Sequence, residues 1–166
     1  PWAATLDAIL IDCGHRLSAA GALTLPNSTQ QQRLSRATAE FAALNISVIP
    51  MVFADYAHAD LGLDALSNSR GVADAFIATA VHEARTHNYA GWNIDWEPCT
   101  GNTRARECGS LSAAHKWPRI PGILKQLAEA MAGHSTPGAT AAPTVSAAGY
   151  ACDVTAAPPT FSHCPY

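Results

Sequence analysis

Three polar side chains at alternate positions of one short segment are the best candidates for chemistry in this chain. The segment 91–97 has the sequence Gly-Trp-Asn-Ile-Asp-Trp-Glu, in which Asn93, Asp95 and Glu97 alternate with apolar residues. Successive side chains of an extended strand point to opposite faces, so these three share one face. The Cα atoms of Asp95 and Glu97 would then lie roughly 6.6 Å apart. At that separation the two carboxyl groups can share a proton or hold one polar group of a substrate.

The same alternation also occurs on the solvated face of an antiparallel sheet, and alternation alone favours that structural interpretation. The other face of the segment, however, carries Trp92, Ile94 and Trp96, which we expect to pack beneath helices. Pro98 and a loop follow, so the carboxyl groups lie at the C-terminal end of the strand. Sheets of α/β proteins place their functional sites at that end.

Composition limits the kind of partner. The chain has 166 residues, of which 48% are apolar and 14% charged, which predicts a single domain, 1–166, with a substantial core. The net charge is −3 and Lys and Arg form no cluster, which argues against nucleic acid and a polybasic membrane patch. No apolar run is long enough to predict a membrane span. The expected partner is a small or neutral molecule.

The cysteines indicate an oxidising environment. Cys99 and Cys108 bracket one loop and Cys152 and Cys164 a Pro-rich tail, so both pairs have local spacing that could close disulfides, and Cys13 is left over. Zinc is the competing interpretation, but the chain has no C-x-x-C pair and its histidines are dispersed. We expect no metal, and the absence of phosphate-binding or dinucleotide fingerprints predicts no cofactor.

Two N-glycosylation sequons agree with that environment. They begin at Asn27 and Asn45, in the sequences Asn-Ser-Thr and Asn-Ile-Ser. Together with the cysteine pairs they favour a secreted, lumenal or cell-surface location.

Strands and helices alternate along the chain. Apolar runs predict buried strands, and apolar residues at three- and four-residue steps predict helices. The predicted strands are 6–13, 46–54, 91–97 and 144–150, and the predicted helices are 28–44, 72–87 and a third that begins near Pro118 and ends at Gly133.

Local sequence adds detail between these elements. Ser28 or Thr29 is the expected N-cap of the first helix. The first strand is expected to be buried on both faces, and 55–64 is expected to form an acidic loop that contains His58. The alternation of apolar strands with helices predicts an α/β fold with a parallel sheet and right-handed crossovers.

The strand motif resembles a known signature. Gly91-x-Asn93-x-Asp95-x-Glu97 is similar to D-G-x-D-x-D-x-E on the fourth barrel strand of glycoside hydrolase family 18, which contains chitinases and chitobiases. Trp96 before Glu97 and Pro98 directly after it also look like the common D-W-E-x-P form of that signature. Asn93 departs from the usual middle Asp, as in chitobiase-like members, and Ala90 stands where the first Asp would be.

The resemblance implies part of a (β/α)₈ barrel. Residues 2–14, 46–54 and 145–150 resemble the second, third and fifth strands of the family. A complete barrel needs about 250 residues, so four strands form an incomplete one. We expect the remaining strands in further chain segments or in a larger assembly that completes the barrel.

The resemblance also implies a mechanism. Family 18 enzymes retain the anomeric configuration and use the substrate's own acetamido group as the nucleophile. Glu97 would donate a proton to the glycosidic oxygen, and Asp95 would orient the acetamido group. Asn93 would tune Asp95 by hydrogen bonding.

Further residues are predicted to bind substrate. Tyr150 ends the fourth predicted strand and Asp153 comes after it, at the end of a barrel where active-site loops gather. Tyr56, at the start of the predicted loop, could line the mouth of the cleft, although a solvated loop is the favoured interpretation of 55–64.

The resemblance implies two candidate functions. The leading hypothesis is a hydrolase of β-1,4-linked N-acetylglucosamine, in chitin-type oligomers or in the chitobiose core of N-glycans. The alternative is a chitinase-like module without catalysis that binds glycans or has a structural role in an extracellular or surface assembly.

Overall fold

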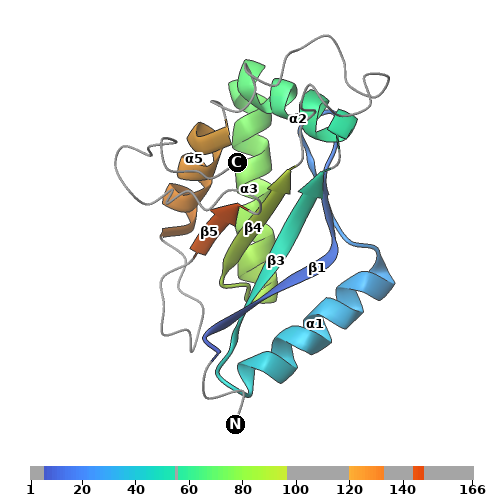
Figure 1. Ribbon diagram of the computed structural model, residues 1–166, viewed down its shortest axis with the longest axis vertical. Helices are drawn as coiled ribbons and strands as arrows, with labels where there is room; N and C mark the ends of the chain where they lie inside the picture. Colours follow the sequence, from blue (N-terminus) through green and yellow to red (C-terminus); the bar gives the residue numbers. More distant parts are fainter. Residues whose placement is uncertain (1–5, 55, 97–119, 133–143, 148–166) are drawn as a thin grey trace.

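The computed structural model describes residues 6–54, 56–96, 120–132 and 144–147 (Figure 1). Its elements are β1 (Ala8–Leu17), β2 (Leu23–Thr24), α1 (Ser28–Ala42), β3 (Ser47–Ala54), α2 (Tyr56–Asn68), α3 (Arg70–His87), β4 (Gly91–Trp96), α5 (Ile120–Ala132) and β5 (Thr144–Ala147). They form one curled sheet with the strand order β2-β1-β3-β4-β5. β1, β3, β4 and β5 pair in parallel, and the short β2 pairs antiparallel with the end of β1. The predicted α/β fold, an incomplete TIM-type barrel, is therefore confirmed.

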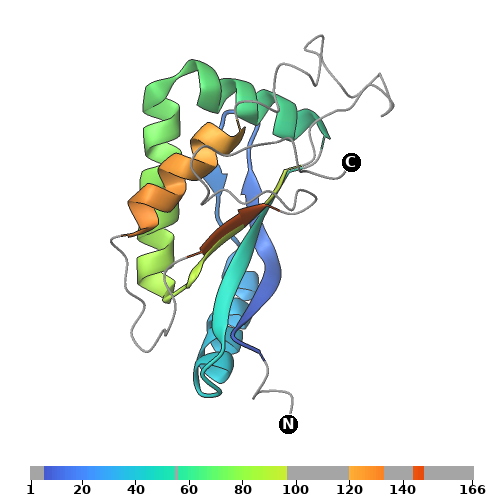
Figure 2. The same cartoon turned by 60° about the vertical axis from the view of Figure 1, so that its left-hand side comes forward.

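The sheet has a covered face and an inner face. Helices α3 and α5 pack on the covered face, and α2 crosses the end toward which the parallel strands point (Figure 2). The residues of β3 and β4 that point toward the helices are almost completely buried: Val48, Val52, Ala54, Trp92, Ile94 and Trp96. We call the opposite face the inner face; it carries the alternate residues of the same strands, among them Phe53 and Asp95. The described part of the chain places no helix there.

The helix termini have local causes. Asn27 is the N-cap of α1, where its side chain accepts a hydrogen bond from the Gln30 backbone and the Gln30 side chain accepts one from the Asn27 backbone. The prediction of Ser28 or Thr29 as the cap was therefore wrong by one or two residues. Ser69 caps α3, which ends at Asn88 in the left-handed conformation with φ 63°.

Two predicted segments differ from the structure. The acidic loop expected at 55–64 is largely helical, as part of α2, and Asp60 is only 2% exposed. Ala59, Leu63 and Leu66 are buried at three- and four-residue steps, and this packing outweighs the helix-breaking tendency of the polar and glycine residues between them.

The first strand also differs. β1 extends to Leu17 through an irregularity between Ile11 and His15, where Gly14 has φ 93°. It is not buried on both faces, since Ala8, Leu10 and Asp12 on its inner side are exposed. Among the described residues, β1 is covered only on its helix side, which accounts for the difference.

β4 is held firmly against α3. The indole Nε1 of Trp92 donates a hydrogen bond to the backbone oxygen of Ala80 at 3.2 Å. Further along the strand, the rings of Trp96 and Phe76 meet edge to face with centroids 5.8 Å apart. These contacts fix the rotation of the strand and so decide which residues face inward.

A buried ionisable cluster supports β4 from the same side. Glu83 of α3 is 5% exposed, and its Oε1 lies 3.2 Å from Nε2 of His87 and 3.9 Å from Nε2 of His15. The His15 ring is fully buried, edge-on to Trp92 with centroids 5.0 Å apart. Neither of its nitrogens has a hydrogen-bond partner in the described part of the chain.

Burial lowers the pKa of His15 to about 4 from the usual 6.5, and the nearby His87 and Arg16 act in the same direction. Asp12 opposes them. The imidazole is therefore neutral in the folded protein at neutral pH.

Within the described residues, no helix has the length and apolar character needed to cross a membrane.

We predict that His15 makes the fold acid-sensitive. Its pKa is lower in the folded chain than in the unfolded chain, so the unfolded chain binds more protons between pH 6.5 and 4. Stability is therefore full above pH 6.5 and is lost as the pH falls toward 4, by about 3 kcal/mol from this group. Urea unfolding at several pH values should show this loss in the wild type and a smaller one in His15→Leu. Parallel pH curves for the two proteins would contradict the prediction.

Candidate functional site

Strand register brings one row of side chains together on the inner face. β3 and β4 pair Phe53 with Asp95, and β1 and β3 pair Arg16 with Phe53. Because the strands are parallel, these three residues lie side by side near the C-terminal ends of their strands. This is the end at which α/β sheets place functional groups.

A second row lies one step below the first. Here Asn93 of β4 pairs with Met51 of β3 and with Ser146 of β5. Asn93 is 3% exposed, and its Nδ2 donates a hydrogen bond to Ser146 Oγ at 2.9 Å. Asn93 Oδ1 is buried and has no partner among the described residues.

Asp95 differs from Asn93 in its surroundings. It is partly exposed and makes no hydrogen bond or ion pair with any other residue that the structure describes. Its lateral neighbour Phe53 offers an aromatic ring rather than a charge. No described side chain therefore competes with a ligand for the Asp95 carboxylate.

The charge of Arg16 is paired with Asp12. Its guanidinium lies 5.1 Å from the centroid of the Phe53 ring and donates to Asp12 Oδ1 at 2.9 Å. The hydrogen bond from Arg16 holds the pKa of Asp12 below its usual value. The Arg16 guanidinium thus pairs with Asp12 and stacks on Phe53, and among the described residues it makes no ion pair with Asp95.

The structure describes only some of the predicted site residues. Asn93 and Asp95 share the inner face, and Trp92, Ile94 and Trp96 face the helices. Tyr56 begins α2, but its side chain lies outside the described part. The residues that lie wholly outside it are Glu97, Tyr150, Asp153, Cys99, Cys108, Cys152 and Cys164.

The remaining predicted positions are on the surface or at its margin. Asn27 and Asn45 are exposed, and glycosylation at both stays a prediction. Cys13 is a free, half-buried thiol whose pKa is raised by burial. Across the described ranges, no three His, Cys, Asp or Glu side chains are arranged to hold a metal ion.

Sequence reasoning did not find Arg16, Phe53 or Ser146. Each occupies an alternate position of its strand, so a face could be assigned to it, but only pairing between strands brings it beside Asn93 or Asp95. Of the three, only Ser146 could have been assigned to the site from the sequence. It lies an even number of residues from the predicted substrate contact Tyr150, so both would share one face of a strand.

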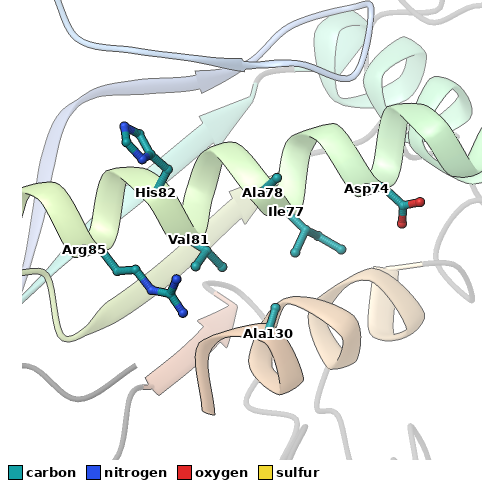
Figure 3. A pocket seen from close by; sticks show the side chains of 7 residues that line it. All are labelled: Asp74, Ile77, Ala78, Val81, His82, Arg85 and Ala130. Atoms are coloured by element: carbon teal, nitrogen blue, oxygen red, sulfur yellow. The ribbon is translucent and has the colours of Figure 1, made fainter. Parts of the chain in front are cut away.

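A separate groove lies on the outer surface, between α3 and α5 (Figure 3). It has a volume of about 410 Å³, and its lining residues are Asp74, Ile77, Ala78, Val81, His82, Arg85 and Ala130. Ile77 and Val81 point from α3 toward α5, which makes the middle of the groove apolar. The groove is on the helix side of the sheet, away from Asp95, and presents no pair of carboxyl groups.

Comparison with solved structures identifies the fold. No protein-family model and no curated protein matches the sequence. A chitinase from Rhizomucor miehei is similar over 81% of this chain and 40% of its own, with a TM-score of 0.60 and 20% identity. The chain has a chitinase-like fold.

Other solved structures share this chitinase-like fold. A chitinase-like agglutinin from Robinia pseudoacacia matches 85% of this chain and 39% of its own at 17% identity, with a TM-score of 0.63. A class V chitinase from Nicotiana tobaccum matches 85% of this chain and 37% of its own at 16% identity, with a TM-score of 0.60. A mutant of that enzyme is known in complex with NAG4. The chain spans less than half the length of each of these proteins.

We predict that the two polar residues of β4 affect stability differently. Asp95→Asn removes a partly exposed carboxylate without a described partner, so the free energy of unfolding should change by no more than about 0.5 kcal/mol. Asn93→Ala removes a buried hydrogen bond and should cost about 1–3 kcal/mol. Chemical unfolding of both variants measures the difference. A loss in Asp95→Asn as large as that in Asn93→Ala would show that Asp95 is a structural residue.

Proposed function

We propose that this chain belongs to a retaining glycoside hydrolase that cleaves β-1,4-linked N-acetylglucosamine. The observation that carries the proposal is the Asp95 carboxylate, which has no partner among the described residues, on the inner face of a chitinase-like sheet at the C-terminal end of β4. The complex of a similar class V chitinase mutant with NAG4 supports an N-acetylglucosamine oligosaccharide as the ligand. Chitin-type oligomers and the chitobiose core are the two substrates of this class.

The proposed reaction needs one acid and the substrate's own acetamido group. Glu97 follows Asp95 by two residues, the period of a strand, and would protonate the glycosidic oxygen as the bond from the anomeric carbon to that oxygen breaks. The acetamido carbonyl oxygen would attack the anomeric carbon from the opposite side and form an oxazolinium ion. Water would then attack the same carbon, break its bond to the acetamido oxygen and so restore the acetamido group, and give a proton to the Glu97 carboxylate. Two inversions at one carbon retain the configuration.

Asp95 would act on the acetamido group. Its carboxylate would accept a hydrogen bond from the acetamido N–H, which orients the carbonyl oxygen toward the anomeric carbon. The same negative charge would stabilise the positive charge that develops on the oxazolinium ring. The pairing of Arg16 with Asp12 supports this role, because Arg16 lies in the same row as Asp95 and its charge is compensated by Asp12.

Phe53 would contribute to binding the sugar. Its ring lies beside Asp95 on the inner face and is covered on one side by the Arg16 guanidinium. Aromatic rings beside a carboxylate suit a pyranose, which has apolar C–H surfaces and polar hydroxyl edges.

Substitution of the proposed acid is the first test. In Glu97→Gln, turnover of an N-acetylglucosamine tetramer should fall by at least about 10²-fold, because the amide cannot protonate the leaving oxygen. Binding of the tetramer and the melting temperature should remain close to those of the wild type. The matched control is Glu129→Gln on the exposed face of α5, which should keep full activity. Turnover in Glu97→Gln equal to that of the control would refute the assignment.

The acetamido group provides a second test. The wild type should hydrolyse the N-acetylglucosamine tetramer and release products first as the β-anomer, which proton NMR detects early in the reaction. A glucose tetramer with the same linkage has no acetamido oxygen and should not be cleaved. Initial release of the α-anomer, or cleavage of both tetramers at similar rates, would exclude substrate assistance.

The similarity to an agglutinin supports a second candidate function. A chitinase-like fold occurs in a protein described as an agglutinin, so a glycan-binding module without catalysis is compatible with this sheet. Wild-type protein that binds the tetramer and releases no product at any pH would favour this function over hydrolysis.

A further inference from the structure

The Asn93 carboxamide is the most enclosed polar group of the candidate site. Asn93 lies on β4 between β3 and β5, and it is 3% exposed. Its partners in strand register are Met51 on one side and Ser146 on the other. The carboxamide therefore has a hydroxyl-bearing residue in register on one side and a thioether-bearing residue on the other.

The hydrogen bond to Ser146 defines the orientation of the nitrogen and the oxygen of the Asn93 carboxamide. An amide nitrogen can only donate, so Asn93 Nδ2 donates and Ser146 Oγ accepts, at 2.9 Å. The carbonyl oxygen is consequently turned away from Ser146. Without this bond the carboxamide could exchange its two ends by rotation about its last side-chain bond.

Asn93 Oδ1 has no donor within the described part of the protein. The Met51 thioether cannot donate a hydrogen bond, Ser146 is engaged with the nitrogen, and an ionised Asp95 carboxylate has only acceptors. Buried acceptors are nearly always paired in native proteins. The donor for this oxygen therefore comes from outside the described residues, and the inner face is the side on which the described part places no helix.

We propose that Ser146 is a positioning residue of the candidate site, which holds the Asn93 carboxamide so that its oxygen accepts a hydrogen bond from an N–H or O–H group of a bound amino sugar. The inference rests on the proposed ligand class. Ser146 itself does not touch the sugar; it acts through Asn93. The pair would orient the same sugar unit whose acetamido group Asp95 holds, because Asn93 and Asp95 are neighbours on one strand face.

The test measures ligand binding in a variant that should not hydrolyse the ligand. In a Glu97→Gln background, calorimetry with the N-acetylglucosamine tetramer should show about three- to tenfold weaker binding for Ser146→Ala, the range expected for one hydrogen bond. Ser146→Thr keeps the hydroxyl and should restore affinity. Ser47→Ala provides a matched control, since Ser47 lies at the other end of β3 and should leave affinity unchanged.

A double-mutant cycle separates positioning from a general structural effect. If Ser146 acts through Asn93, the change Ser146→Ala should have no further effect on binding in an Asn93→Ala protein. Equal losses in both backgrounds, or unchanged affinity in Ser146→Ala alone, would overturn the inference. Failure of Ser146→Thr to restore binding would do the same.

The outcomes also separate this inference from the proposed hydrolysis. Tetramer binding that depends on Ser146, without turnover in the wild type, upholds the positioning role and refutes hydrolysis. Turnover in the wild type with full affinity in Ser146→Ala upholds hydrolysis and refutes the positioning role. A wild type that neither binds nor cleaves the tetramer overturns both.

Discussion

The alternation of side chains along β4 is the constraint on which the candidate site depends. Trp92, Ile94 and Trp96 are all buried against the helices, and the Trp92 indole is hydrogen-bonded to the backbone of α3. A strand cannot turn one residue without turning its neighbours, so burying this apolar set obliges Asn93 and Asp95 to face inward. The packing that stabilises the core therefore also orients the polar groups. A shift of register by one residue would bury the carboxylate and expose two tryptophans.

The neighbouring strands give the two polar residues unequal environments. Asn93 is enclosed between Met51 and Ser146, and its amide oxygen has no partner among the described residues. Asp95 is more exposed and lies beside Phe53, whose ring is covered by the Arg16 guanidinium that Asp12 binds. A rigid amide below an accessible anion is a suitable base for binding an amino sugar, whose acetamido and hydroxyl groups supply the donors that both residues need.

Sequence predicted the parts of this arrangement that depend on local periodicity. The two faces of β4 follow from strict alternation, and the long helices from apolar spacing. The helix at 55–64 was missed because His58, Asp60 and Gly62 interrupt its local signal, and packing of Ala59 and Leu63 decides the outcome. Arg16, Phe53 and Ser146 were missed for a different reason: they join the site through lateral register, which is set by pairing between segments far apart in the chain. Leu10 was expected in the core but faces the uncovered side of β1.

The central claim is that the inner face at the C-terminal end of β4 binds N-acetylglucosamine oligomers. A crystal structure of Glu97→Gln with the N-acetylglucosamine tetramer tests it most directly. We expect one sugar unit over Phe53, with its acetamido nitrogen within hydrogen-bonding distance of an Asp95 carboxylate oxygen and a sugar donor on Asn93 Oδ1. A tetramer bound in the groove between α3 and α5, or on the inner face without contact to Asp95, would contradict the account.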